Sequence, residues 1–174
     1  MPNGKVVKDV MIDVFEYPHV PYWFTIKQAI GIIKKSLLGS EKCFHPLAVL
    51  VFDEKYNLMG FVTLKDILKG LEPHLFKTKT MADADVSYVD ENALAGIEAG
   101  LFSSESKKLA EKPVSEIMVP VKTHVAPGDS VVKTAFLMVY NNTTILPVLE
   151  NKQKLVGLVR MVEVYKEVSD SVIG

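Results

Sequence analysis

The chain carries one segment twice, and this internal repeat constrains its fold more than any other feature. Residues 58–67 (LMGFVTLKDI) return as residues 155–164 (LVGLVRMVEV), with a glycine at the same place in each copy. Further blocks recur in the same order: 51–55 with 148–152, and 7–11 with 114–118. Copies of about 60 residues are longer than the units of most solenoid repeats. We therefore expect two related small domains.

Composition narrows the class of protein. The 174 residues are 48% hydrophobic, which is enough for a real core, and the formal net charge is −1. Binders of nucleic acid or anionic lipid usually carry a basic excess, so neither partner is expected. The single Cys43 excludes an intramolecular disulfide, and no stretch resembles a signal peptide or a membrane helix. We expect a cytoplasmic protein.

The first copy reads as helix, strand, strand, helix. Apolar residues at helical spacing predict an amphipathic helix over residues 25–38, with Thr25 as its N-cap. Residues 46–52 and 58–63 predict two strands joined by a polar turn, which is a hairpin. A second helix is expected over residues 64–71.

The second copy repeats this order. Asp129 or Ser130 is expected to cap a helix that runs to residue 139, followed by strands over 145–149 and 155–159 and a closing helix from residue 162. The domain boundaries that we expect are 1–76 for the first repeat, 77–112 for a helical insertion or linker, and 113–174 for the second repeat. Within the insertion, a helix is expected to be followed by the polar residues 103–106.

Each copy thus has the order helix, strand, strand, helix, with an apolar-Met pair in front and Gly-apolar-Val-Thr-x-x-Asp, or a variant of it, at the last strand-to-helix step. Residues 60–66 (GFVTLKD), 146–148 (LPV) and 157–163 (GLVRMVE) carry this pattern, which resembles the cystathionine-β-synthase-type (CBS) domain pair, or Bateman module. The resemblance implies an α+β fold with α/β sandwich-like halves, in which two tandem β-α-β-β-α repeats are related by a pseudo-two-fold axis. It also implies two inter-repeat clefts that take adenine nucleotides or S-adenosylmethionine, and a homodimer.

The resemblance points to specific ligand-binding residues. Thr63 lies at a strand-to-helix step, where unpaired amides and the helix dipole favour phosphate. Asp66 would accept hydrogen bonds from both ribose hydroxyls, as the family's Asp does. By the same resemblance, the segments that face adenine are Leu47, Ala48 and Val49 in the first copy, and Thr144, Ile145, Leu146 and Pro147 in the second. The alternative for Thr63 and Asp66 is a helix-capping pair, worth about 1 kcal/mol.

The second copy departs from this pattern, because Arg160 replaces the hydroxyl and Glu163 replaces the aspartate. Arg160 is suited to bidentate phosphate binding, so the second cleft is expected to depend more on phosphate than on ribose. The alternative is an ion pair on a solvated helix, worth about 0.2 to 0.5 kcal/mol. The first copy also departs, since Leu50 stands where the second copy has Pro147.

The sequence gives weaker evidence for other kinds of site. His19, His45, His74 and His124 lack the spacing of zinc ligands, so no metal site is expected. The aromatic and proline-rich residues 16–24 are expected to pack over the protein's own core rather than to form an adenine platform or a partner surface. Common catalytic motifs are absent from the sequence, so we expect a protein that is not an enzyme.

The sequence therefore leaves two alternative functions. The first is a stand-alone regulatory module that binds AMP, ADP, ATP or S-adenosylmethionine in one or both clefts and relays binding to a dimer interface or to an unidentified protein partner. No cofactor is required, because the ligand is regulatory. The second is an interaction or scaffolding module with vestigial clefts. The altered second motif favours the scaffold, and the intact Thr63 and Asp66 pair opposes it.

Overall fold

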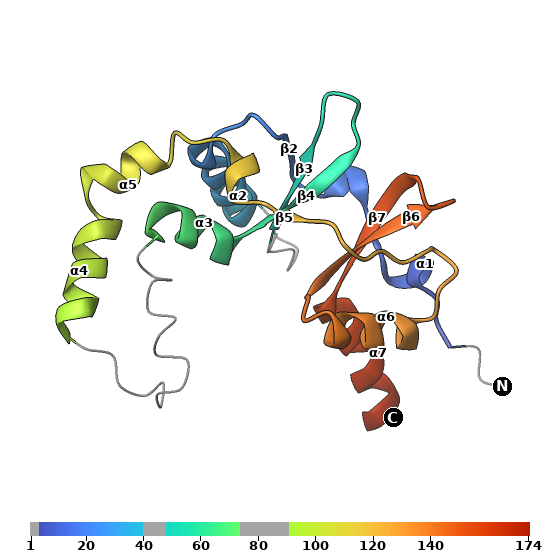
Figure 1. Ribbon diagram of the computed structural model, residues 1–174. Helices are drawn as coiled ribbons and strands as arrows, with labels where there is room; N and C mark the ends of the chain where they lie inside the picture. Colours follow the sequence, from blue (N-terminus) through green and yellow to red (C-terminus); the bar gives the residue numbers. More distant parts are fainter. Residues whose placement is uncertain (1–3, 40–47, 74–90) are drawn as a thin grey trace. The chain divides into compact units, whose positions relative to one another are not determined.

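The structure is a computed structural model that describes residues 4–39, 48–73 and 91–174. The chain divides into two compact units, one made of Pro18–Pro120 and the other of Met1–Tyr17 together with Val121–Gly174. We call them the central unit and the terminal unit. Each is a mixed layer of sheet and helices, and each contains one of the two strand-to-helix steps singled out above (Figure 1).

The central unit is built on a four-stranded sheet with the order β2-β3-β4-β5. Its strands are β2 (His19–Pro21), β3 (Ala48–Phe52), β4 (Leu58–Thr63) and β5 (Val119–Pro120). β2 runs parallel to β3, and the other neighbours are antiparallel. The β3–β4 pair is the hairpin expected from the sequence, although residues 46 and 47 lie outside the described residues.

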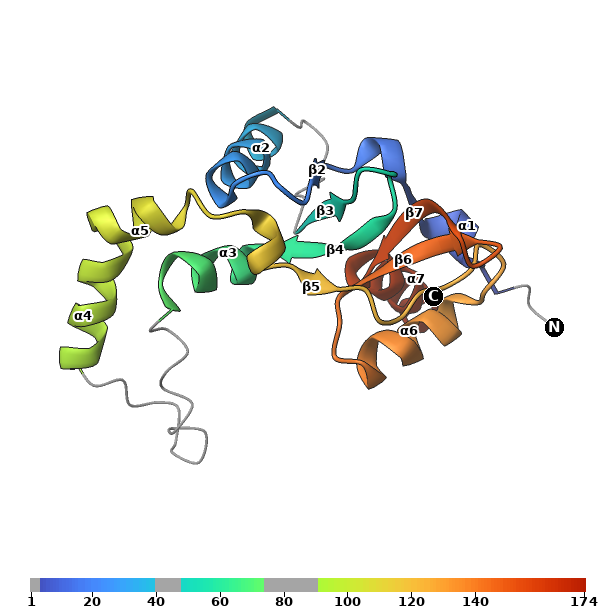
Figure 2. The ribbon, with the colours of Figure 1, turned by 45° about the horizontal axis from the view of Figure 1, so that its top comes forward.

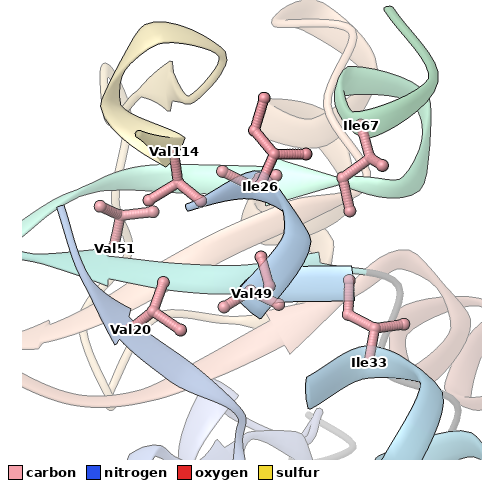
Figure 3. Close-up of a cluster of buried hydrophobic side chains, with 9 residues drawn as sticks. Val20, Ile26, Ile33, Val49, Val51, Ile67 and Val114 are labelled. Atoms are coloured by element: carbon pink, nitrogen blue, oxygen red, sulfur yellow. The ribbon is translucent and has the colours of Figure 1, made fainter. Parts of the chain in front are cut away.

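Helices α2 (Ile26–Gly39) and α3 (Leu64–Leu71) contribute to the core of the central unit, and the short helix η3 (Val114–Glu116) precedes β5. α2 begins as expected, because the Thr25 hydroxyl accepts from the Gln28 amide at 3.1 Å and the Gln28 side chain accepts from the Thr25 amide at 2.8 Å. Figure 3 shows the resulting core, whose labelled side chains are Val20, Ile26, Ile33, Val49, Val51, Ile67 and Val114.

The inserted segment contributes two helices, α4 (Glu91–Leu101) and α5 (Ser104–Leu109). The expected helix is therefore present, whereas the polar residues 103–106 prove to be the N-cap and the first turn of a second helix. α5 packs against both α3 and α4 (Figure 2). Beyond α5, the carbonyls of Ala110 and Lys112 accept from the first amides of α2, which would otherwise be unsatisfied.

The terminal unit has a three-stranded antiparallel sheet with the order β1-β7-β6. Its elements are α1 (Val7–Val10), β1 (Ile12–Asp13), the short helix η1 (Val14–Glu16), α6 (Val131–Tyr140), β6 (Ile145–Glu150), β7 (Lys154–Arg160) and α7 (Met161–Ile173). Ser130 is the N-cap of α6. Buried valines, Met138 and Leu146 form the core between this sheet and its helices.

The boundaries of the two sequence copies differ from those of the two compact units. β1 belongs to the first copy in sequence, yet it pairs with β7 of the second copy. β5 directly follows residues 114–118 of the second copy, which correspond to residues 7–11 of the first. It nevertheless pairs with β4 of the first copy. Each unit therefore completes its sheet with a strand that lies far away in sequence.

These crossing strands explain the glycine that both motifs share. A Cβ atom on Gly60 would lie 2.4 Å from the carbonyl oxygen of Val119 in β5, and one on Gly157 would lie 2.5 Å from that of Ile12 in β1. No side chain fits at either position, because the edge strand passes directly over the α-carbon. The repeated glycine is thus a packing requirement of the sheet.

Candidate functional site at the strand-to-helix steps

The first step joins β4 to α3 and is closed by a complete capping box. Thr63 is the N-cap, with extended backbone angles (φ −89°, ψ 167°). Its side-chain oxygen accepts from the Asp66 amide at 3.2 Å, and Oδ2 of Asp66 accepts from the Thr63 amide at 2.9 Å. The Thr63 hydroxyl also donates to Oδ2, at 2.6 Å. The capping alternative for this pair therefore describes a real feature of the structure.

Capping does not use the whole carboxylate. Asp66 is only 7% exposed. The side-chain hydrogen bonds that it makes within the described ranges all use Oδ2, which leaves Oδ1 as an acceptor without a donor from these residues. One group can thus begin the helix and still offer an oxygen to a hydroxyl donor.

The strand beside this step carries the residues that the resemblance assigned to adenine. Ala48 lies opposite Thr63 in the β3–β4 register, and Val49 lies opposite Val62. Val49 packs into the core of the central unit, so only its backbone can face a ligand. Leu47 lies outside the described residues. The structure therefore brings Ala48, Thr63 and Asp66 together.

One residue near this step was not singled out from the sequence. Lys65 is exposed in the first turn of α3, and its ammonium group makes no ion pair with any residue that the structure describes. A cation within reach of a helix N-terminus supplements the amides in binding an anion. The only signal in the sequence was its place two residues after the capping threonine.

The second step, from β7 to α7, has the same backbone and different side chains. Arg160 is the N-cap (φ −105°, ψ 159°), and Oε2 of Glu163 accepts from its amide at 3.1 Å. The guanidinium folds back onto the same carboxylate, with Nε 3.1 Å from Oε1 and 3.0 Å from Oε2 and Nη2 also bonded to Oε1. The ion pair is present, but Arg160 is buried rather than solvated.

The strand beside the second step is β6. Ile145 lies opposite Arg160 in the register, and the carbonyl of Thr144 accepts from the Met161 amide at 2.8 Å. Leu146 packs into the core of the terminal unit, and Pro147 is buried. The exposed Thr144 and the buried Ile145 therefore lie beside Arg160, whereas the side chain of Leu146 points into the core.

The aromatic segment packs as expected over much of its length. Val20 belongs to the core of the central unit, and Tyr22 and Phe24 pack against it. Trp23 remains 51% exposed, with its ring edge-on to that of Tyr22. This segment is therefore mainly structural.

No group of three or more His, Cys, Asp or Glu side chains among the described residues is arranged to hold a metal ion, while Cys43, His45 and His74 lie outside those residues. None of the described helices combines the length and the apolar character that crossing a membrane requires.

Comparison with known proteins agrees with this architecture. Residues 114–170 match the family model of the CBS domain. The structure of CBSX2 from Arabidopsis thaliana, a CBS-pair protein, is similar with a TM-score of 0.63 and 18% identity over 99% of each chain. The chain has the tandem CBS fold. The search of curated proteins gave no match.

Two similar structures of the CBS fold were solved with nucleotides. CBSX2 in complex with AMP has a TM-score of 0.63 at 17% identity, over 96% of this chain and 98% of that one. The cytosolic domain of the Mg2+ channel MgtE in complex with ATP has a TM-score of 0.55 at 22% identity, over 90% of this chain and 46% of that one. These nucleotides belong to those proteins.

Proposed function

We propose that this tandem CBS protein is a cytoplasmic regulatory module that binds an adenosine-containing ligand, either AMP, ADP, ATP or S-adenosylmethionine, and does not turn it over. The observation that carries the proposal is Asp66, a buried carboxylate whose Oδ2 is held by Thr63 and whose Oδ1 has no donor among the described residues. The nucleotide complexes of CBSX2 and MgtE support the choice of an adenosine ligand.

Each part of the first step matches one part of such a ligand. Oδ1 of Asp66 accepts from ribose hydroxyls, and the bonds to Thr63 hold the carboxylate in one orientation. The first amides of α3 and the exposed Lys65 face the phosphate. The backbone of Ala48, directly opposite Thr63, reads the edge of the base.

The relay surface that we propose is the exposed side of α6 and α7, which pack against each other in the terminal unit (Figures 1 and 2). α6 exposes Val132, Phe136, Val139 and Tyr140, and α7 exposes Val162, Tyr165 and Val172. Exposed apolar stripes of this kind usually mark protein interfaces, and we propose a second copy of this chain as the occupant. Ligand can shift dimerisation only through a difference in affinity between the two states.

The first experiment is a thermal-shift screen with adenosine, AMP, ADP, ATP, S-adenosylmethionine and GTP, in which a ligand at 100 times its Kd adds about 2.7 kcal/mol of stability. Asp66→Ala should abolish the shift caused by the adenosine ligand. Asp9→Ala is the matched control, because Asp9 accepts from an N-cap amide in the same way at 3.0 Å but lies in α1. A full shift in Asp66→Ala would leave capping as the only role of this residue.

The scaffold remains the second candidate, and the paired Arg160 and Glu163 favour it because they leave the second step without a ligand-ready carboxylate. If no adenosine compound shifts the melting temperature, the exposed side of α6 and α7 becomes the functional surface. Phe136→Asp, on the exposed side of α6, should then convert a dimer to a monomer in light scattering.

A further inference from the structure

The two strand-to-helix steps differ in how much of their carboxylate is free. This comparison rests on the proposed function, because it concerns where the adenosine ligand binds. At the first step, the Thr63 side chain engages only Oδ2 of Asp66. At the second, Arg160 engages both oxygens of Glu163, and the Arg160 amide engages one of them again. The carboxylate that would chelate a ribose is therefore already occupied.

Arg160 itself is an unusual residue at the start of a helix. The positive end of the helix dipole disfavours a cation at this place, and the guanidinium has no lone pair with which to cap the helix amides. Its side chain is nevertheless only 5% exposed, while that of Glu163 is 20% exposed. The bidentate pair with Glu163 compensates for the unfavourable position, since charge-assisted bonds of this kind are strong.

We propose that Arg160 is the residue that determines specificity between the two steps, by acting as an internal cation that closes the second step to ribose. The protein then takes up one adenosine nucleotide per chain, at Thr63 and Asp66. A nucleotide at the second step would first have to separate a buried ion pair, which weakens its binding by about a hundredfold relative to an open site. The second step is thus a self-filled site.

The test is isothermal titration calorimetry with AMP, and separately with ATP, on three proteins. The natural chain should bind one nucleotide per chain, and Asp66→Ala should bind none. The double variant Arg160→Thr with Glu163→Asp, which copies the first step, should bind two. Circular dichroism and thermal melting establish that each variant is folded. Threonine and aspartate are favourable at these capping positions, so the double variant is expected to fold.

Other calorimetric results would contradict the inference, the proposed function or both. Two nucleotides per chain in the natural protein would overturn the inference and leave the proposed function standing, as would a folded double variant that still binds one. Binding that survives Asp66→Ala would overturn it too, and a fourth protein, Arg160→Ala, would then lose binding if the ligand lies at the second step. No binding in any variant would overturn the proposed function together with the inference. Binding by the double variant alone would overturn the proposed function and the single site at Thr63 and Asp66, and would leave only the closing role of Arg160.

If the double variant does not fold, Glu163→Gln replaces it. The glutamine keeps the size of the side chain and removes its charge, so the pair with Arg160 is weakened without a cavity. A weak second binding event in Glu163→Gln is then the expected result, and its absence at millimolar AMP and ATP contradicts the closing role of Arg160.

Discussion

The step after β4 and the step after β7 begin their helices with the same backbone geometry and solve the same capping problem with opposite chemistry. The Thr63 side chain accepts from a helix amide, and its hydroxyl donates to one oxygen of the Asp66 carboxylate. The guanidinium of Arg160 cannot accept a hydrogen bond, and it instead neutralises a longer carboxylate with a buried charge. Both arrangements satisfy the N-cap amide, yet only the first leaves a carboxylate oxygen for another molecule.

The comparison teaches that a repeated fold position does not imply a repeated site. Both copies keep a glycine beneath a crossing strand, which the sheet requires, and a carboxylate that accepts from the N-cap amide, which the helix requires. What they may vary is the residue at the N-cap, which decides whether that carboxylate serves the helix alone.

The largest effect is expected where the two units are alike. Gly60→Ala and Gly157→Ala each place a Cβ atom within 2.5 Å of a backbone oxygen of the edge strand, so a strand must shift. We expect each to lower the free energy of unfolding by about 3 kcal/mol, measured by urea denaturation. Gly31→Ala in α2 is the control, because nothing lies near its added methyl, and it should stabilise by up to about 1 kcal/mol.

A loss at only one of the two glycines would show that the edge strands β1 and β5 are not held alike. The parallel between the units would then end at the level of the sheet, before any side chain of the steps is considered.

The next effect distinguishes the units. Glu163→Ala leaves the buried guanidinium of Arg160 at a helix N-terminus without this carboxylate, and we expect a loss of about 2 kcal/mol, below the full penalty for a buried pair because Glu163 is 20% exposed. Chemical denaturation measures it. Replacing both residues, as Arg160→Leu with Glu163→Leu, should recover most of the loss, since no unpaired charge is then buried. A double variant less stable than Glu163→Ala would contradict this account.

A smaller loss is expected at the first step. Thr63→Ala removes the side-chain oxygen that accepts from the Asp66 amide, and the free energy of unfolding should fall by about 1 kcal/mol in the same assay. Thr63→Ser keeps the oxygen and should remain close to the natural protein. If Thr63→Ala cost as much as Glu163→Ala, the two steps would differ less in energy than their contacts indicate.

The smallest effect concerns the two hairpin turns. In the β3–β4 turn, a hydrogen bond from the Asn57 side chain, joined by backbone amides of Asn57 and Lys55, lowers the pKa of Asp53 below its ordinary value. The β6–β7 turn instead uses the backbone carbonyl of Glu150. Because the folded pKa is depressed, the stability that Asp53 contributes is present above the unfolded pKa of about 3.9 and is lost as the pH falls through the folded value.

Nuclear magnetic resonance checks this prediction. The amide shifts of Lys55 and Asn57 should follow the titration of the Asp53 carboxyl, with a midpoint below that of an unperturbed aspartate, and Asp53→Asn should remove the transition. A midpoint at or above the usual value would mean that these bonds do not favour the ionised form. The amide of Gln153, in the other turn, provides the comparison within the same spectra.

Much of the secondary structure was predictable because it depends on neighbours in sequence. Apolar spacing located the helices after Thr25, Thr63 and Ser130, and two apolar runs around a polar turn located each hairpin. The capping role of Thr63 and Asp66 was also readable, since the two residues are three apart on one helix turn. The helix α5 was missed because its polar, lysine-rich sequence lacks an apolar stripe.

Pairing over long distances in sequence was not predictable in this way. The sequence places β1 with the first copy and β5 with the second, but antiparallel registers with β7 and β4 place each in the other sheet. The burial of Arg160 has the same origin. An Arg and a Glu three residues apart suggest a solvated pair, and only the packing of the surrounding strand and helix removes the guanidinium from water.

By itself, then, the sequence determined the repeat, the helices, the hairpins and the capping residues of this protein, because each follows from contacts within one turn or one hairpin. The tertiary structure alone decided which edge strand completes which sheet, why each motif needs its glycine, and why the guanidinium of Arg160 is buried. Those properties depend on atoms that are distant in the chain and meet only when the sheets form.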